Sequence, residues 1–306
     1  AFVLNSLYEG FAHVIPEAML AGTPVIAVDL PSGLSGRTGE PTGACFKASH
    51  TVTFAVLKPG HVLMPGRTLC GEVHLCDIGI PDRLIVADEA LYINHTGLYE
   101  PRLPGSDGSV HKYAKGHLVV FSGPLIATGA SRLAALAGLR SGAGLVTMAT
   151  PPGAVMVQAS HLTAIMQRAI AAPQELELWL DDPRLSAFVI GPGFSNPDLL
   201  RDHVGVLASS GRPVVLDADG LTAFAGATDR LSELFSGETR LVLTPHEGEF
   251  RRLLPEIAEK PGLSKIDRAR RLAESSNGVV VYKGADTVIA APDGRAAVNV
   301  DAPEWL

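Results

Sequence analysis

Residues 187–198 read Ala187-Phe-Val-Ile-Gly-Pro-Gly-Phe-Ser-Asn-Pro-Asp198, an apolar run that passes through a glycine turn into the start of a helix. Ser195 or Asn196 is able to cap this helix, and Pro197 suits its first turn. The two glycines allow a ligand to approach the backbone closely. A tight β-α turn without a ligand has the same pattern. The stretch therefore predicts a β-α unit and leaves a binding role open.

Similar units follow one another along the second part of the chain. β-branched apolar runs alternate there with helical patterns, which indicates a mainly parallel sheet of an α/β protein. Ligands bind at the carboxyl ends of the strands in such sheets. Four of these ends carry glycines, a proline or acids, which predicts a binding crevice. The expected strands are 117–122, 144–149, 187–190, 213–217, 240–244 and 278–283.

The first part of the chain has a different organisation. Strand-like runs at 24–29, 50–56 and 72–75 are joined by turn-rich segments. The polar segment 86–110 contains prolines and a Gly-Ser-Asp-Gly run without a sustained period, which predicts a linker. We therefore expect a partial domain at 1–85, a linker at 86–110 and a second domain at 111–306.

Composition excludes some classes of partner. The net charge is −7 and no basic run occurs, which argues against a nucleic-acid or membrane-surface partner. No apolar stretch reaches the roughly 18 residues of a membrane span. Cys45, Cys70 and Cys76 have neither metal-ligand spacing nor an even disulfide count, so we expect reduced cysteines in a cytoplasmic protein. A homo-oligomer stays open.

A second helix start occurs at Thr244-Pro-His-Glu247. Threonine at the cap, proline next and glutamate three residues on predict a capping box. His246 then falls in the first turn, where the helix dipole favours a neutral imidazole that both donates and accepts hydrogen bonds. The alternative is a plain helix start with His246 on the surface. We expect Glu249 to face solvent and Phe250 to face the core.

Polar groups also follow two other strands. Asp217 and Asp219 project to the same side of an extended segment and are able to hold Mg²⁺ or a ligand hydroxyl, unless Asp219 only caps the next helix. Lys283 precedes a glycine turn and can reach a phosphate, although exposed Lys-Gly hairpins share this pattern. The helix that begins near Gly129-Ala130 offers backbone amides to an anion, or simply packs on the sheet.

A run of motifs in order marks residues 111–306: His111-Lys112, Thr128-Gly-Ala130, Arg140-Ser-Gly-Ala-Gly-Leu-Val146, Gly191-Pro-Gly193, Leu216-Asp-Ala-Asp219, Leu243-Thr-Pro-His-Glu-Gly-Glu249 and Lys283-Gly284. In these motifs the segment resembles the ADP/ATP-dependent NAD(P)H-hydrate dehydratases. The resemblance implies a ribokinase-like three-layer α/β/α fold and removal of water from (S)-NAD(P)H-hydrate with ADP or ATP and Mg²⁺. It implies that Ala130, Gly193 and His246 contact the hydrated nucleotide. The implied adenine-nucleotide contacts are Lys283, Gly284, Ala285, Asp286 and Thr287.

Residues 27–85 contain four further motifs: Ala27-Val-Asp-Leu-Pro-Ser-Gly33, Thr51-Val-Thr-Phe54, Leu57-Lys-Pro-Gly60 and Asp77-Ile-Gly-Ile-Pro81. In these motifs the segment resembles the end of the Rossmann-like α/β domain of NAD(P)H-hydrate epimerase, which is often fused upstream. The resemblance implies that Asp29 contacts the hydrated nucleotide and that Ser32 helps to hold K⁺.

Three features depart from these families. The epimerase's upstream loop with its other K⁺ ligands is absent. The dehydratase's Gly-x-Gly-Asp segment, with its catalytic acid, is expected beyond Leu306, so we expect this chain to be truncated at both ends and inactive by itself. Residues 6–26 also resemble the nucleotide-sugar motif of retaining glycosyltransferases, with Glu9 and Glu17 in its acidic positions. A junction with foreign sequence and a diverged epimerase segment are the two explanations.

Two alternative functions stay open. A small-molecule kinase of the ribokinase type shares the fold, but such a kinase is expected to lack Thr-Pro-His-Glu-Gly-Glu. A non-catalytic nucleotide-binding fragment would bind nucleotide without turnover.

Overall fold

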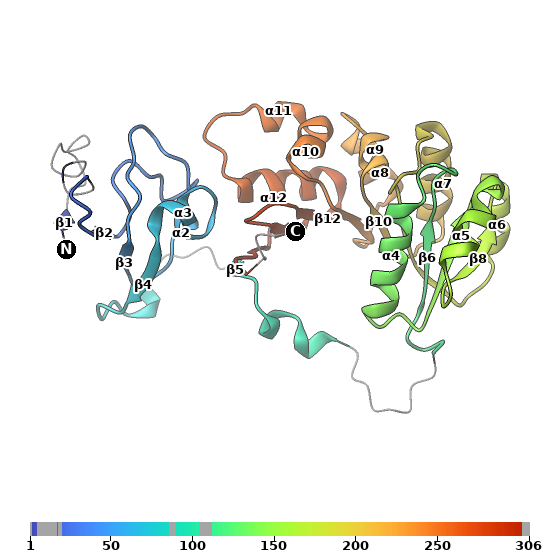
Figure 1. Ribbon diagram of the computed structural model, residues 1–306, viewed down its shortest axis with the longest axis horizontal. Coiled ribbons are helices and arrows are strands. Elements are labelled where there is room, and N and C mark those ends of the chain that lie inside the picture. The colour runs from blue at the N-terminus through green and yellow to red at the C-terminus, as the bar shows by residue number, and fades with distance from the viewer. Residues whose placement is uncertain (1, 5–16, 18–19, 86–89, 104–111, 302–306) are drawn as a thin grey trace.

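The computed structural model describes residues 2–4, 17, 20–85, 90–103 and 112–301. Two sheets organise these residues (Figure 1). The smaller sheet has the order β1-β2-β3-β4, and its paired strands are parallel. Two short helices, α2 (Pro59–Val62) and α3 (Gly66–Cys70), connect its last two strands. Its strands are β1 (Phe2–Leu4), β2 (Val25–Val28), β3 (His50–Phe54) and β4 (Glu72–Cys76).

The larger sheet has ten strands in the order β5-β14-β13-β12-β11-β10-β9-β6-β7-β8. Seven neighbouring strands run parallel to one another, namely β12, β11, β10, β9, β6, β7 and β8. Strand β13 is antiparallel to both of its neighbours. The strands are β5 (Leu91–Ile93), β6 (His117–Phe121), β7 (Leu145–Thr150), β8 (Met166–Ala169), β9 (Leu185–Ile190), β10 (Val214–Leu216), β11 (Leu241–Leu243), β12 (Gly278–Tyr282), β13 (Val288–Ala290) and β14 (Ala296–Val298).

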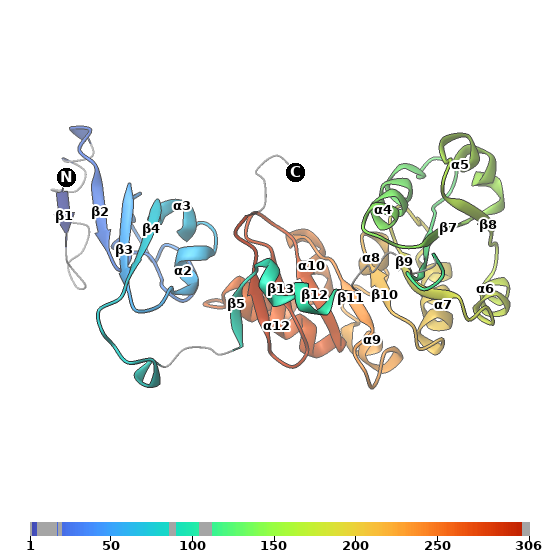
Figure 2. The same ribbon diagram turned by 90° about the horizontal axis from the view of Figure 1, so that it is seen from below.

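Helices cover both faces of the larger sheet (Figure 2). Val119 and Phe121 pack in one core cluster with Leu200 of α7, whereas Val120 packs in a second cluster with Ala135 of α4. Because successive strand residues face opposite sides of a sheet, α4 and α7 cover opposite faces, which makes three layers. The helices are α4 (Gly129–Arg140), α5 (Val155–His161), α6 (Pro173–Leu180), α7 (Pro197–Ser209), α8 (Asp219–Thr222), α9 (Thr228–Leu234), α10 (Glu247–Leu253), α11 (Pro255–Ala258) and α12 (Lys265–Ser276).

The strands expected from the sequence form with ends that differ by one or two residues. Strand β8 at the sheet edge was not expected, because its residues are mostly exposed and carry no apolar run. The segment 86–110, which we expected to be a linker, contributes β5, and β5 pairs with β14 in the larger sheet. This strand, Leu91–Ile93, is only three residues long and lies at the sheet edge within an otherwise polar segment, so it produced no sustained pattern.

The two sheets are joined through the segment around α2 and α3. Leu63 is fully buried within the core cluster of the larger sheet. The backbone N–H of Met64 donates to the Asp286 carboxylate at 2.8 Å, and Arg67 donates to the carbonyl of Val300 at 2.9 Å. Residues 63–67, which connect two strands of the smaller sheet, therefore also contact residues of the larger sheet and its turns. None of the helices in the described ranges is both long and apolar enough to cross a membrane.

Candidate functional site

Five neighbouring strands end at the same edge of the larger sheet. Strands β12, β11, β10, β9 and β6 are consecutive in the sheet order and parallel, so the residues that follow them form a row. Glycine turns follow β6 and β9, two aspartates follow β10, His246 lies after β11, and Lys283 follows β12. The topology therefore brings together the segments that the sequence marked out.

The glycine turns in this row pack directly against one another. A Cβ on Gly123 would lie 1.6 Å from the carbonyl oxygen of Gly193, and a Cβ on Gly191 would lie 1.9 Å from that of Asp217. Gly191 also has φ 126°, a conformation that other residues rarely adopt. Contacts within the protein thus already require these glycines, and the turns after β6, β9 and β10 form one compact surface.

The two aspartates after β10 have different partners. Asp217 accepts hydrogen bonds from Thr244 Oγ1 at 2.7 Å and from Lys283 Nζ at 2.9 Å, which ties three strand ends together. Asp219 Oδ2 accepts from the backbone N–H of Ser195 at 2.9 Å. Asp219 is the first residue of α8 and does not cap it, because the N-cap position is Ala218.

His246 occupies the N-cap of α10, so the expected capping box at Thr244–Glu247 is wrong by two residues. The ring Nδ1 accepts from the N–H groups of Gly248 and Glu249, and the N–H of His246 donates to Glu249 Oε2 at 2.8 Å. An accepting Nδ1 requires a neutral ring with its proton on Nε2. The side chain is 54% exposed, and Nε2 lies 3.5 Å from Glu249 Oε1, so its proton faces both this carboxylate and solvent.

The expectation that Glu249 faces solvent is wrong, because this residue is only 5% exposed. The capping interaction with His246 draws it inward, and Lys283 Nζ lies 3.8 Å from its Oε2. Phe250 is buried as expected and stacks on Tyr282 with ring centroids 4.6 Å apart. Burial, together with a hydrogen bond to Glu247, raises the pKa of the Tyr282 hydroxyl.

The turn between β12 and β13 is held by its own side chains. Thr287 Oγ1 donates to the carbonyl of Gly284 at 2.8 Å and accepts from its N–H at 3.2 Å. Asp286 is 5% exposed and accepts from Lys265 Nζ at 2.6 Å as well as from Met64. Asp286 therefore positions the turn, a role that the sequence did not reveal because Lys265 and Met64 are distant in the chain.

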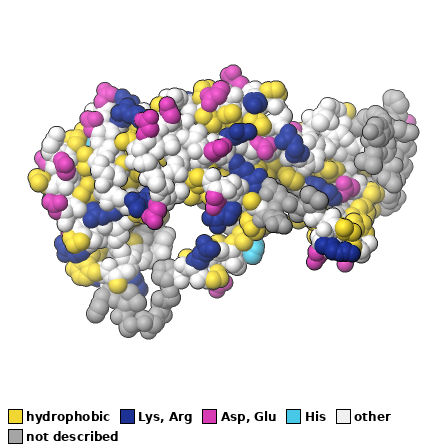
Figure 3. Space-filling model, turned by 180° about the vertical axis from the view of Figure 1, so that it is seen from behind, with side chains coloured by type: hydrophobic (Ala, Val, Ile, Leu, Met, Phe, Trp, Pro, Cys, Tyr) yellow, Lys and Arg dark blue, Asp and Glu magenta, His cyan; other side chains and the backbone are white. Residues whose placement is uncertain are grey.

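A cavity of about 630 Å³ lies beside this turn, between the start of α12 and residues 35–42. Its basic side chains each face a carboxylate, so a phosphate entering it would share these cations with acids already present. Figure 3 likewise shows basic and acidic side chains intermingled on the face that it presents. The pairs are Arg37 with Asp267 at 2.8 Å, Lys265 with Asp286 at 2.6 Å, Lys283 with Asp217 at 2.9 Å, and Arg268 with Glu247 at 4.0 Å.

Ala130 is exposed in the first turn of α4. A fully buried side chain, Gln158, supports this helix start by donating to Ser122 Oγ at 2.7 Å and more weakly to the carbonyl of Thr128 at 3.4 Å. Gln158 Oε1 is buried without a hydrogen-bond partner among the described residues. No motif in the sequence pointed to this glutamine, because it comes from α5.

Asp29 follows β2 and is held by residues from the next β-α connection. Its Oδ1 accepts from Lys58 Nζ and from Thr53 Oγ1 at 2.8 Å, and His61 Nε2 lies 2.7 Å from its carbonyl oxygen. Burial acts to raise the pKa of Asp29, but the hydrogen bonds from Lys58 and Thr53 outweigh it, and the pKa is lowered. Ser32 lies three residues further on and is partly exposed.

The three layers define a ribokinase-like α/β protein, and the strand ends form one row at the carboxyl edge of its sheet. A solved ribokinase-like protein from Enterococcus faecalis V583 shares this fold, with a TM-score of 0.56 at 19% identity over 70% of this chain and 73% of that one. More specifically, the chain belongs to the NAD(P)H-hydrate dehydratase family, whose model matches residues 118–305. A second model, the YjeF-related protein N-terminus, matches residues 3–60.

Named relatives agree with this membership. The bifunctional NAD(P)H-hydrate repair enzyme Nnr of Moorella thermoacetica is 38% identical over 97% of this chain and 58% of its own length, and that of Escherichia coli is 32% identical over 95% and 55%. The ADP/ATP-dependent NAD(P)H-hydrate dehydratase of Bacillus subtilis, co-crystallized with ATP/Mg²⁺, has a TM-score of 0.56 at 26% identity over 69% of this chain and 73% of that one. The chain spans a little over half the length of these curated relatives.

The match at 3–60 includes the segment 6–26, which also resembled a glycosyltransferase motif. It assigns this segment to the YjeF-related N-terminus, which counts against a junction with foreign sequence there. Glu9 lies outside the described residues, and Glu17 is exposed.

Proposed function

We propose that this protein takes part in the repair of hydrated nicotinamide nucleotides. The larger sheet would carry the ADP- or ATP-dependent dehydration of (S)-NAD(P)H-hydrate, and the smaller sheet would belong to an epimerase of the same hydrate. The observation that carries this proposal is the row formed by Gly193, Asp217, His246 and Lys283 at neighbouring strand ends. Membership of the dehydratase family supports it. The division into parts at 1–85 and 111–306 belongs to the same proposal.

The hydrated nucleotide would lie along the row near Ala130, Gly193 and His246. The exposed Nε2–H of His246 would donate to an oxygen of the hydrated nicotinamide. The capping bonds at Nδ1 hold this tautomer in place, so the donor is oriented before the ligand arrives. Turns after β6 and β9 would supply backbone groups, because their packing keeps side chains out of the way.

The adenine nucleotide would lie against the turn formed by Lys283, Gly284, Ala285, Asp286 and Thr287, which borders the 630 Å³ cavity. Lys283 Nζ has three N–H donors and uses one on Asp217, so donors remain for a phosphate. Asp217 and Asp219 offer the hard oxygen atoms that Mg²⁺ prefers, and together with phosphate oxygens they fit its needs. Bound Mg²⁺ would neutralise phosphate charge there.

The epimerase part would use Asp29 to contact the hydrated nucleotide. Its lowered pKa keeps the carboxylate ionised, and Lys58 and Thr53 hold it in one orientation. Ser32, in the turn that follows, would contribute to a K⁺ site. We further propose a cytoplasmic protein, consistent with a nucleotide substrate.

The proposal is tested with the product of the complete gene, supplied with (S)-NADH-hydrate and either ADP or ATP. Recovery of the NADH absorbance band that depends on the adenine nucleotide is the expected result. Phosphorylation of another small molecule without recovery of NADH would favour the ribokinase-type kinase. Binding of both nucleotides without any reaction would leave a non-catalytic nucleotide-binding protein.

A further inference from the structure

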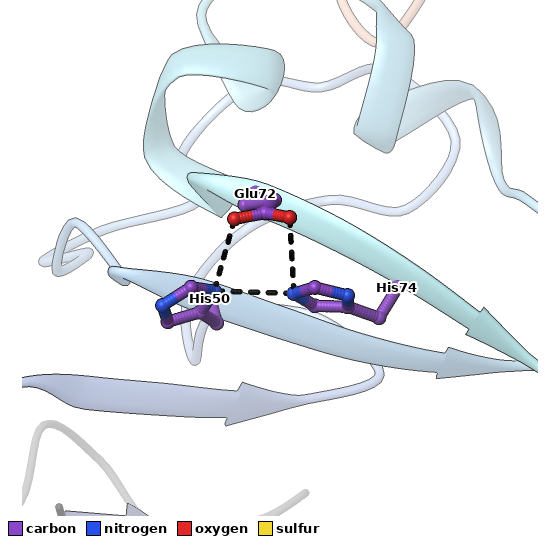
Figure 4. A group of neighbouring side chains, drawn as sticks. All are labelled: His50, Glu72 and His74. Carbon is purple, nitrogen blue, oxygen red and sulfur yellow. Dashed lines mark hydrogen bonds and ion pairs between the residues drawn. The ribbon is translucent and has the colours of Figure 1, made fainter.

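Three side chains with metal-ligand chemistry lie together on the smaller sheet, and none of them belongs to the candidate functional site. They are His50 on β3, and Glu72 and His74 on β4 (Figure 4). His50 is the cross-strand partner of Glu72. Glu72 and His74 are two residues apart on one strand and therefore face the same side of the sheet. Strand pairing thus sets the positions of all three side chains.

The ligand atoms lie close together, and each ring nitrogen faces a different oxygen of Glu72. His50 Nδ1 and His74 Nε2 are 3.1 Å apart, His50 Nδ1 is 3.5 Å from Glu72 Oε2, and His74 Nε2 is 3.7 Å from Glu72 Oε1. A tetrahedral Zn²⁺ with bonds of about 2.0–2.2 Å separates its ligand atoms by about 3.3–3.6 Å. The three contacts are close to this separation, and one ligand atom from each side chain lies within 4.8 Å of the other two.

The facing ring nitrogens also create an electrostatic requirement. Two neutral nitrogens with lone pairs directed at each other repel at 3.1 Å, and two N–H groups would clash. A single shared proton or a bound cation removes this repulsion. Glu72 adds a negative charge beside both rings, which favours a cation.

We propose that His50, Glu72 and His74 form a binding site for Zn²⁺ or a divalent ion of similar preference, such as Co²⁺. Imidazole and carboxylate are ligands that suit these ions. The three side chains are 45%, 68% and 44% exposed, so the remaining coordination position faces solvent. A water molecule or a ligand atom from another molecule would occupy it, which is the arrangement of an open metal site.

This site is independent of the proposed repair chemistry. None of its ligands belongs to the nucleotide crevice or to the turn that carries Asp29 and Ser32. Within the described residues, it is the only cluster of three or more histidine, cysteine, aspartate or glutamate side chains close enough to share an ion. Metal binding can therefore be measured without any substrate.

The test titrates the metal-free 306-residue chain with Co²⁺, followed by its visible absorption, and with Zn²⁺, followed by calorimetry. One equivalent of either ion is expected to bind, with a four- or five-coordinate Co²⁺ spectrum. His74→Ala and Glu72→Gln should each weaken binding by at least about 10-fold. His161→Ala removes an exposed histidine at the end of α5 and should leave the affinity unchanged.

Protons compete with the metal for the imidazoles, so lowering the pH should release the ion. Circular dichroism of each variant checks that the sheet is retained, which is expected because the side chains are exposed. Equal affinities for the parent chain and His74→Ala would overturn the proposal. Absence of saturable Co²⁺ and Zn²⁺ binding would overturn it too, and would leave the three side chains as a hydrogen-bonded cluster.

Discussion

His246 has an observed structural role and a proposed binding role in one ring. Nδ1 caps α10, whereas Nε2, which lies 3.5 Å from Glu249 Oε1, is the atom that we propose to contact the hydrated nucleotide. The capping role explains the buried position of Glu249, which completes the box. Removing the ring would therefore remove both the cap of α10 and the proposed hydrogen bond to the ligand. A substitution that keeps the cap separates these two effects.

His246→Asn keeps a good N-cap but removes the Nε2–H donor. We expect the free energy of unfolding to stay within about 0.5 kcal/mol of the parent protein. Affinity for the hydrated nucleotide should fall by about 2- to 10-fold, the value of one hydrogen bond. ATP affinity should be unchanged. His246→Ala should lose about 1 kcal/mol of stability in addition. Urea unfolding and ligand titration measure these effects, and equal losses of affinity for both ligands would contradict the assignment.

At the scale of the elements, the row of strand ends depends on turns that pack against one another. The loop after β6 contacts the loop after β9 through Gly123 and Gly193, and the loop after β9 contacts that after β10 through Gly191 and Asp217. Asp217 then connects to β11 and β12 through Thr244 and Lys283. The strand ends form one connected unit because each loop packs against the next one.

Gly123→Ala should break this unit, because the added Cβ would lie 1.6 Å from a backbone oxygen. A backbone atom cannot move aside without shifting its loop, so we expect a loss of at least about 1–3 kcal/mol in the free energy of unfolding. Gly205→Ala is the matched control, since a Cβ there meets nothing within 4 Å in the middle of α7. That control should gain up to about 1 kcal/mol. A Gly123→Ala protein as stable as the control would show that the turns do not support one another.

On the scale of the whole molecule, three buried histidines link stability to pH. Burial lowers the pKa of His61, His117 and His203 below the ordinary value of 6.5. Below about pH 6.5 the unfolded chain takes up protons that the folded protein does not bind. The stability that these neutral rings contribute is therefore present above pH 6.5 and is lost as the pH falls toward their folded pKa values.

We expect the free energy of unfolding to decrease between pH 7.5 and 5.5, by up to about 1.4 kcal/mol per pH unit for each histidine. His203 lies between Phe121 and Phe194, so His203→Leu keeps an apolar core contact and removes one titrating ring. The pH dependence of that variant should be smaller. Urea unfolding midpoints at pH 7.5 and 5.5 measure this pH dependence. If the variant loses as much stability between the two pH values as the parent protein, His203 does not contribute to the pH dependence.

The sequence by itself determined the buried strands, their alternation with helices and the residues at the strand ends, but not the edge strands β5 and β8. These features depend on apolar periodicity and turn chemistry, which act between near neighbours. Only the tertiary structure decided which partners those residues have. Lys265 and Met64 reach Asp286 from 21 and 222 residues away, and Asp217 meets Lys283 across 66 residues. Likewise, β5 and the cluster at His50 follow from strand pairing. Local patterns do not specify such contacts, because they arise only when the whole chain has packed.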